Sequence, residues 1–270
     1  MKAVIKSSKC ALMLIEILKV VKNLSQHISM TFNENEVYIQ IMDGSHICLL
    51  DININSDWFH EYEVNAGEVI SLNVNILLKI ISLYTMNTVI TMMVSDSQEN
   101  MEVILEYGNV NKNFEIPLMD IEFDHLEPGE NDYSCDFEMK TRVLEKYLNE
   151  LMIFGEKIDF KYKNDKLYLS SSGSEGKMNI EIPSDSLESL CVEEDISLQC
   201  AFDIKYIVYI SKLTASFSTM SISFDKEYPL FCKFSDDNIN IKYFVAPKMN
   251  DDGYESDDDL NNEVVGSSDF

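Results

Sequence analysis

The feature that most constrains the fold is an internal repeat with a spacing of about 130 residues. The segments Leu72–Leu83 and Phe202–Leu213 both pass from a short strand-like stretch into a helical pattern. An alternating pattern typical of a strand follows each of them, at Thr88–Val94 and at Ser218–Phe224. Self-similarity at a fixed spacing indicates repeated structural units, so the simplest interpretation is two copies of one domain in tandem.

Four helices are predicted from apolar side chains that recur at three- and four-residue steps. They are Lys9–Leu24, Asn73–Thr85, Thr141–Phe154 and Asp203–Ala215. Alternating runs rich in β-branched and aromatic residues predict strands around the helices. These strands are Ile28–Phe32, Glu36–Ile41, His46–Asn53, Thr88–Val94, Met101–Tyr107, Phe114–Leu118, Ile158–Tyr162, Lys166–Ser170, Met178–Ile182, Ser197–Ala201, Thr219–Phe224, Leu230–Phe234 and Ile239–Val245. The mixture of helices and hairpin-forming strands in each half indicates an α+β fold.

A long acidic segment separates the two halves. Residues 119–133 contain Pro128 and Gly129 and lack periodicity, which predicts a connecting loop. We therefore expect an N-terminal domain at residues 1–118 and a C-terminal domain at residues 134–249. Residues 250–270 carry eight acidic side chains and no Lys or Arg, which predicts an acidic, disordered tail.

The formal net charge of −26 argues against general affinity for nucleic acids, because phosphate contacts need Lys and Arg. The predicted helices differ from the rest of the chain, since they hold eight basic and four acidic residues, a net charge of 8 − 4 = +4. The basic residues are Lys9, Lys19, Lys22, Lys79, Arg142, Lys146, Lys205 and Lys212. These residues lie either on separate solvated helix faces or on one shared basic surface. A shared surface could hold a nucleic-acid backbone without reading bases.

The sequence lacks the common signatures of enzymes and metal sites. The six Cys residues form no CxxC pair, and the four His residues show no spacing typical of metal ligands. We find no Gly-rich phosphate loop and no GxSxG motif. The apolar stretch Cys10–Ile15 is far too short to cross a membrane. We therefore predict no enzymatic activity, no cofactor, no metal and no membrane association.

Short segments spread along the chain match one family pattern. Met42–Leu50 resembles the Met-Asp-Ser-Ser-His-Val-x-Leu segment of proliferating cell nuclear antigens, and Tyr243–Lys248 resembles their C-terminal Tyr-Tyr-Leu-Ala-Pro-Lys. Leu118–Glu122 and Asp132–Cys135 are similar to the start and the end of their interdomain connecting loop. The helices at 73–81 and 204–212 match as well, and the resemblance extends over about residues 1–249.

The resemblance implies a DNA sliding clamp of two tandem clamp domains, with helices lining the inner face and antiparallel sheets outside. It implies a homotrimeric ring around double-stranded DNA, opened by a clamp loader, that tethers DNA polymerase and other PIP-box proteins during replication and repair. The implied location is the nucleus, or a viral replication site for a virus-encoded chain. The family residues that face DNA correspond to Lys22, Lys79, Lys146, Lys205 and Lys212, to which Lys9, Lys19 and Arg142 are added.

The resemblance also implies a pocket for a short helical peptide with a hydrophobic plug and aromatic residues. Its residues here are Met42, Ile47, Leu49, Leu126, Pro229, Phe244, Ala246 and Pro247. From the sequence alone, the first three of these are equally well interpreted as ordinary strand core. Ring closure is expected between one strand with Phe114 and Ile116 and another with Met178 and Ile180.

Other functions stay open at this point. A diverged subunit could need hetero-partners, or act as a monomeric processivity factor. A clamp-fold interaction scaffold could have lost its DNA. A nuclease that uses carboxylates would need a clustered acidic site, for which the sequence has no motif.

Overall fold

The computed structural model describes residues 1–95, 99–121, 125–129, 131–194 and 196–248. The predicted tail at residues 250–270 lies outside these ranges. The described α-helices are α1 (Ser8–Leu24), α2 (Val74–Ile81), α3 (Thr141–Leu151) and α4 (Ile204–Ser211), and the short 3₁₀ helices are η1 (Ser56–Trp58), η2 (Ser184–Ser186) and η3 (Leu213–Ala215). None of the helices in the described ranges is long and apolar enough to span a lipid bilayer.

The described strands form three antiparallel sheets. The five-stranded sheet contains, in spatial order, β5 (Glu61–Glu63), β1 (Lys2–Ile5), β7 (Val89–Val94), β8 (Asn100–Tyr107) and β9 (Val110–Pro117). The nine-stranded sheet contains β14 (Ser189–Val192), β10 (Cys135–Lys140), β16 (Thr219–Phe224), β17 (Leu230–Ser235), β18 (Ile239–Val245), β4 (Cys48–Asn55), β3 (Glu36–Met42), β2 (His27–Phe32) and β6 (Glu68–Asn73). The four-stranded sheet contains β13 (Gly176–Pro183), β12 (Lys166–Gly173), β11 (Lys157–Lys163) and β15 (Leu198–Asp203).

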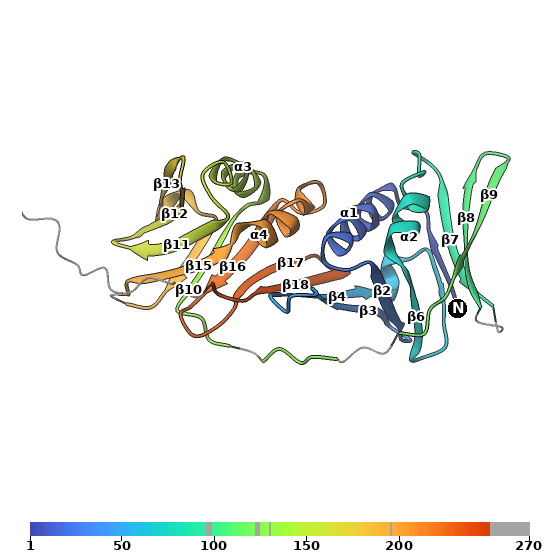
Figure 1. The fold of residues 1–270 in the computed structure, drawn as a ribbon. Coiled ribbons are helices and arrows are strands. Elements are labelled where there is room, and N and C mark those ends of the chain that lie inside the picture. The colour runs from blue at the N-terminus through green and yellow to red at the C-terminus, as the bar shows by residue number, and fades with distance from the viewer. Residues whose placement is uncertain (96–98, 122–124, 130, 195, 249–270) are drawn as a thin grey trace, which may run out of the picture.

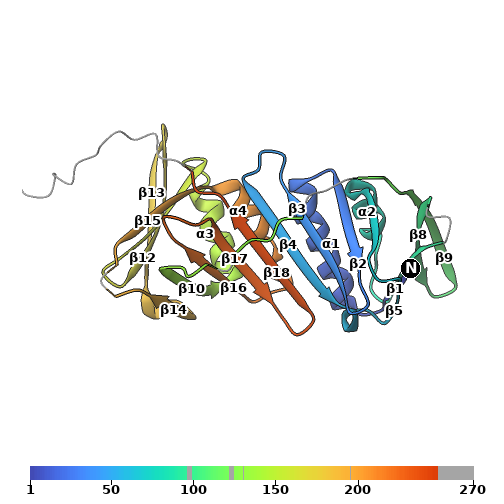
Figure 2. The same ribbon diagram turned by 90° about the horizontal axis from the view of Figure 1, so that it is seen from below.

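The nine-stranded sheet joins the two halves of the chain. Its strands β14 to β18 come from the second half and its strands β4, β3, β2 and β6 from the first. The halves meet where β18 pairs with β4, from Ile239 opposite Ile54 to Val245 opposite Cys48 (Figure 2). Because ladder hydrogen bonds cross this junction, the two halves form one continuous sheet.

All four α-helices cover the same face of the nine-stranded sheet (Figure 1). α1 packs beside α2 and α3 packs beside α4, while α1 also contacts α4 across the junction between the halves. The two smaller sheets stand at opposite ends of the molecule, with β9 at one end and β13 at the other. The described parts of the segment between β9 and β10 run along the face of the sheet opposite to the helices.

All four helices begin within one residue of the predicted position; α1 also ends where predicted, whereas α2, α3 and α4 end three or four residues earlier. Asn73 caps α2, and its side chain accepts hydrogen bonds from the N–H groups of Asn75 and Ile76. Asp203 caps α4 in the same way through the N–H group of Lys205. The predicted helix to Thr85 stops at Ile81 because the next residues form tighter bonds, such as the N–H group of Leu83 to the carbonyl of Ile80.

The repeat extends to the whole order of elements. Each half contains a strand, an α-helix, three strands, a 3₁₀ helix, two strands, a second α-helix and three strands, and the second half has η3 in addition after α4. The strands β1, β5, β6, β10 and β14 were not among the predicted strands, and they complete this order. The two halves are therefore two copies of one unit.

Candidate nucleic-acid and partner-binding surfaces

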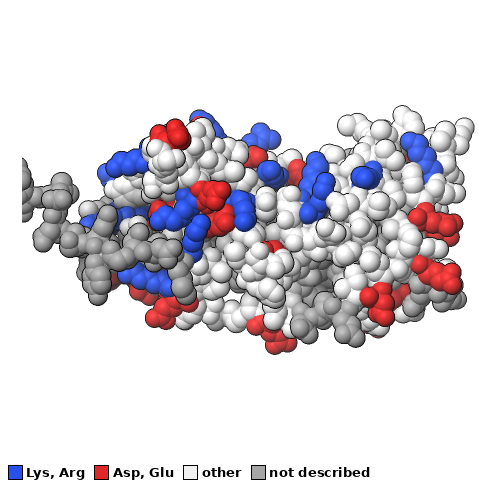
Figure 3. All heavy atoms as spheres, in the orientation of Figure 1, with Lys and Arg blue, Asp and Glu red and all other residues white. Residues whose placement is uncertain are grey.

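The eight predicted cations all project from the layer of helices. Seven of them lie in α1 to α4, and Lys212 directly follows α4. Every one of the eight side chains is exposed. Figure 3 shows blue spheres along the side of the molecule on which the helices lie, and mostly red spheres along the opposite margin. This arrangement favours one shared basic surface over separate solvated faces.

Three of the eight cations already have acidic partners. Lys9 lies 3.2 Å from Asp236, and Lys146 lies 3.8 Å from Glu150. Lys205 lies 3.3 Å from Asp203 and also sits over a tyrosine ring at 4.7 Å from its centroid. Ion pairs as exposed as these contribute little and exchange readily for a phosphate. No ion pair is seen for Lys19, Lys22, Lys79, Arg142 and Lys212 within the described ranges.

The helices also expose apolar side chains, which the sequence analysis did not single out. Leu12 of α1 is 54 % exposed, Ile76 of α2 is 42 % exposed and Val143 of α3 is 37 % exposed. Ile153, just after α3, is 72 % exposed. The helical surface is therefore mixed, with cations separated by apolar patches, and its positive charge is sparse.

A tight turn between β3 and β4 forms one wall of the predicted peptide pocket. Its backbone closes through the N–H group of His46, which donates to the carbonyl of Asp43 at 2.9 Å. His46 has a φ of 56°, a left-handed conformation that marks a turn residue. The carboxylate of Asp43 also accepts hydrogen bonds from the N–H groups of Ser45, Ile47 and Cys48, at 2.7 to 3.0 Å. The turn is thus held by a single buried acid.

The same acid connects the two halves of the chain. The hydroxyl of Tyr206 in α4 donates to Asp43 at 2.7 Å, and Tyr243 donates to the carbonyl of Tyr206 at 2.9 Å. Burial alone would raise the pKa of Asp43, but the hydrogen bonds from Tyr206 and the three backbone N–H groups outweigh it and hold the pKa below its ordinary value. Asp43 is therefore ionised at neutral pH, and its charge stabilises the turn and the junction together.

Strand pairing brings most of the predicted pocket residues together. Leu49 lies opposite Met42 on one side and opposite Phe244 on the other. The N–H group of Ala246 donates to the carbonyl of Ile47 at 2.8 Å. Leu49 is only 8 % exposed, so it forms the base of this region rather than its surface.

The remaining pocket residues come from the connecting segment and from the ends of β-strands. Leu126 is 39 % exposed. Pro229 directly precedes β17, and its carbonyl accepts a hydrogen bond from the hydroxyl of Tyr133 at 3.0 Å. Pro247 is exposed just after β18.

Gln40 fixes the connecting segment to the sheet. Its side-chain amide donates to the carbonyl of Leu126 at 2.7 Å and accepts from the N–H group of Leu126 at 2.8 Å. The Gln40 side chain is almost buried and also donates to Asp51 and to the hydroxyl of Tyr38. His125 adds an edge-to-face contact with the ring of Tyr38. Leu126 is therefore anchored on both sides of its peptide unit.

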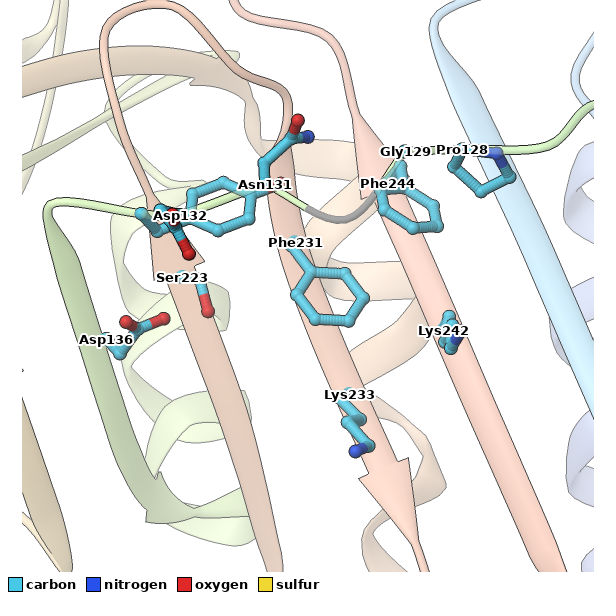
Figure 4. A pocket seen from close by; sticks show the side chains of 11 residues that line it. Pro128, Gly129, Asn131, Asp132, Asp136, Ser223, Phe231, Lys233, Lys242 and Phe244 are labelled. Atoms are coloured by element: carbon cyan, nitrogen blue, oxygen red, sulfur yellow. The ribbon is translucent and has the colours of Figure 1, made fainter.

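A cavity of about 390 Å³ opens beneath the second part of the connecting segment (Figure 4). The segment supplies one wall and the outer face of β16, β17 and β18 supplies the other. The lining residues are Pro128, Gly129, Asn131, Asp132, Tyr133, Asp136, Ser223, Phe231, Lys233, Lys242 and Phe244. Of the eight pocket residues predicted from the family resemblance, Phe244 is the one that lines this cavity.

The strands predicted to close the ring are both edge strands. β9 ends the five-stranded sheet and β13 ends the four-stranded sheet, so each has one unpaired side. Phe114, Met178 and Ile180 are half-buried, whereas Ile116 is 1 % exposed and packs into the core. Edge strands with half-buried apolar residues are suited to pairing with another strand.

Comparisons with known proteins agree with this architecture. The family model described as "Proliferating cell nuclear antigen, N-terminal domain" matches residues 6–127. Proliferating cell nuclear antigen 2 of Plasmodium falciparum is 24 % identical over 260 residues, which cover 87 % of this chain and 95 % of that protein. The proliferating cell nuclear antigen of Chaetomium thermophilum is 24 % identical over 248 residues, which cover 88 % of this chain and 95 % of that protein. All three matches point to the same family, so the chain is similar to proliferating cell nuclear antigens over most of its length.

A solved structure extends the likeness to the whole fold of this chain. A chain of the PCNA2–PCNA3 complex from Sulfolobus tokodaii matches with a TM-score of 0.82 and 21 % sequence identity. The match covers 92 % of this chain and 99 % of that chain. Both tandem units therefore have the clamp fold.

Proteins of the proliferating cell nuclear antigen family are non-enzymatic sliding clamps. Within the part of the chain that the structure describes, no group of three or more His, Cys, Asp or Glu side chains could hold a metal ion. The candidate functional surfaces are the basic helical face, the predicted peptide pocket with its neighbouring cavity, and the two edge strands.

Proposed function

We propose that this chain is the subunit of a DNA sliding clamp that encircles duplex DNA and tethers DNA polymerase and other replication and repair proteins. The observation that carries the proposal is the placement of all eight helical cations on one side of a molecule whose opposite ends are free edge strands. A closed ring holds its partners near the template by topology, at high effective concentration, without base-specific contacts.

The repeat explains how copies of the chain join. In the order of elements, β9 of the first half corresponds to β18 of the second, and β4 corresponds to β13. The pairing of β18 with β4 inside the chain thus has a counterpart between chains, in which β9 of one copy pairs with β13 of the next. This pairing joins a five-stranded sheet to a four-stranded sheet, which reproduces the composition of the nine-stranded sheet.

The repeat also predicts the register of that pairing. The 130-residue offset makes Leu72 equivalent to Phe202 and Val89 equivalent to Thr219. When the strand pairings are followed from these positions, Ile52 corresponds to Ile180 and Lys112 corresponds to Ile241. Ile241 lies opposite Ile52 inside the chain, so Lys112 of one copy lies opposite Ile180 of the next.

This register matches the side chains on both faces of the new pair. Phe114 falls opposite Met178, so two half-buried apolar side chains cover each other. On the other face, the exposed acid Glu115 falls opposite the exposed base Lys177. Opposite charges at directly facing positions stabilise an antiparallel pair, whereas like charges destabilise it. The two edges are complementary within one sequence, which supports a homotrimer over an assembly with a different partner.

A charge swap tests the ring. Glu115→Lys and Lys177→Glu each place like charges at the seam, and each is expected to lower the trimer fraction seen by native mass measurement at micromolar concentration. Each effect corresponds to about 0.2–1 kcal/mol per facing pair, multiplied over the seams of the ring. The double variant restores the opposite charges and recovers the trimer.

Two control variants separate an effect at the seam from a general effect of the changed charge. Glu106→Lys makes the same change of charge on β8, which is no edge strand, at a position opposite Asn111 and Val89, and Lys163→Glu makes the opposite change at the end of β11. Both controls are expected to assemble as the unchanged chain does. A chain that is monomeric before any substitution refutes the homotrimer, and a double variant no better than the single variants refutes the register.

Partner proteins are proposed to dock on the face opposite to the helices. The pocket residues of the turn between β3 and β4, of the connecting segment and of the chain after β18 lie together there. An apolar patch rimmed by polar loop residues suits a short amphipathic peptide. A nuclear location, or a viral replication site, fits the same role.

One observation favours a second candidate, an interaction scaffold that keeps the clamp fold without holding DNA. The helical face is only weakly basic, because three of its eight cations are paired and Leu12, Ile76 and Val143 are exposed among them. The two functions differ in whether the unpaired helical cations matter, which is tested below.

A further inference from the structure

Two lysines on the floor of the cavity face each other at an unfavourable position. Lys233 of β17 and Lys242 of β18 are direct cross-strand partners in an antiparallel pair, and both line the cavity. Figure 4 shows the two side chains next to each other on neighbouring strands, below Phe231 and Phe244. Like charges directly opposite one another destabilise a sheet. Two facing lysines are unexpected in a chain with a net charge of −26, and a bound anionic group would offset their repulsion.

No acid of the described part of the chain forms an ion pair with either lysine. Asp51 lies opposite Lys242 on the other side, but its carboxylate accepts hydrogen bonds from Tyr38 and Gln40, at 2.6 and 3.2 Å. Asp132 and Asp136 line the same cavity, yet no ion pair joins either of them to the lysines. Both ammonium groups therefore have free hydrogen-bond donors toward the cavity.

The repeat does not account for the pair either. The positions of the first half that correspond to Lys233 and Lys242 are Ile104 and Asn113, both uncharged. The lysines are thus no shared requirement of the clamp unit. They belong to the half in which the connecting segment forms a cavity over the sheet.

Aromatic rings continue the floor beside the lysines. The rings of Phe231 and Phe244 stack at 5.0 Å with an interplanar angle of 24°. Tyr133 of the connecting segment stacks on Phe231 at 6.1 Å. A site with an aromatic wall and two adjacent cations suits a ligand that has an aromatic group next to an anionic one.

We propose that the Lys233–Lys242 pair binds an acidic side chain of the docked partner peptide, while a neighbouring aromatic side chain of that peptide packs on Phe231 and Phe244. The proposal rests on the proposed docking of partner peptides at this face and adds a selection rule to it. Among peptides that fit the pocket, those with a carboxylate beside their aromatic residues bind more tightly. A carboxylate between two ammonium groups relieves their repulsion, so the gain exceeds that of an isolated surface ion pair.

The test compares two fluorescent peptides by anisotropy. Both carry the hydrophobic plug and the aromatic residues of the PIP-box pattern. One has Asp on each side of the aromatic residues and the other has Asn at the same positions. The unchanged chain is expected to bind the Asp peptide about three- to tenfold more tightly. In the double variant Lys233→Gln with Lys242→Gln, the ratio of the two affinities is expected to fall to about one.

The control variant and the outcomes separate this proposal from the docking itself. Lys163→Gln removes one charge from β11, away from the cavity, and keeps the ratio. Equal binding of both peptides to the unchanged chain, or a ratio that survives in the double variant, overturns the proposal. If neither peptide binds the unchanged chain, the proposed docking fails and this proposal fails with it.

The acidic residues 250–270 of the chain itself are the other conceivable occupant. If the site is open to partners, a chain ending at residue 249 binds both peptides as the full chain does. A selective gain of affinity for the Asp peptide after this truncation assigns the lysines to the chain's own acidic segment and overturns the proposal of an external occupant.

Discussion

Replacing Tyr206 by Phe isolates the hydrogen bond that joins α4 to the turn between β3 and β4. The change removes one hydroxyl, and the ring keeps its place in the core. A hydrogen bond to a charged group contributes about 1.5–3 kcal/mol to stability. Asp43 keeps three backbone donors and is not left without partners, so we expect the lower end, about 1.5 kcal/mol.

The effect has a predictable dependence on pH. Because the pKa of Asp43 is lower in the folded chain than in the unfolded chain, its ionised form stabilises the fold at neutral pH. This stabilisation is fully present above the unfolded pKa of about 3.9 and is lost as the pH falls through the folded pKa. Tyr206→Phe removes a donor and raises the folded pKa toward its ordinary value. The stability difference between the two chains therefore shrinks as the pH falls below about 4.

Urea unfolding followed by circular dichroism measures both effects. The chain concentration must be held constant, because assembly shifts the apparent stability. Tyr209→Phe is the matched control, since Tyr209 lies in the same helix, is half-buried, and its hydroxyl makes no hydrogen bond to any described residue. Tyr209→Phe is expected to lower the free energy of unfolding by less than about 0.5 kcal/mol. Equal costs for the two variants, or a difference that does not change with pH, would refute the reasoning.

Two further predictions concern the proposed binding surfaces. Reversing Lys79 and Lys212 to Glu is expected to abolish the stimulation of polymerase processivity on primed circular DNA, because both side chains are exposed without ion pairs on the helical face. The same reversals at Lys163 and Lys226, which lie outside the helices, serve as the control, and unchanged processivity in the first variant would favour the scaffold. Gln40→Met removes both hydrogen bonds to Leu126 and is expected to weaken partner-peptide binding about tenfold. Because Asp51 and Tyr38 also lose a donor, the free energy of unfolding is expected to fall by about 1–3 kcal/mol. Equal peptide affinity would show that the connecting segment needs no such anchor.

The sequence predicts what depends on local pattern. All four helices appear within a few residues of their predicted bounds, because apolar side chains at helical spacing mark each buried face. The alternating strands of the hairpins were found for the same reason. β10 was missed, although it alternates between buried and half-buried residues, because its apolar residues are few and are separated by the acids Asp136 and Glu138.

Contacts between distant residues could not be predicted in this way. The opposition of Lys233 and Lys242 requires the register of two strands, and the anchoring of Leu126 by Gln40 spans 86 residues. Neither leaves a periodic signal in the chain. The family resemblance supplied most of the predicted pocket, but it gave no reason to expect the cavity with Phe231 on its floor. The order of elements in the two halves, in contrast, was foreshadowed by a weak repeat.

The proposed ring has two kinds of junction, β18 with β4 inside each chain and β9 with β13 between chains. Both are antiparallel strand pairs, but they differ in the side-chain bonds that cross them. Across β18 and β4, Tyr206 bonds to Asp43 and Lys9 pairs with Asp236. At the same 130-residue spacing, the counterpart of Tyr206 is Ile76, which has no hydroxyl to offer the neighbouring copy. In such a ring, the β18–β4 junctions inside each chain would carry these side-chain bonds, and the β9–β13 junctions between chains would lack the tyrosine bond. The junctions between chains would therefore be the ones that open to admit DNA.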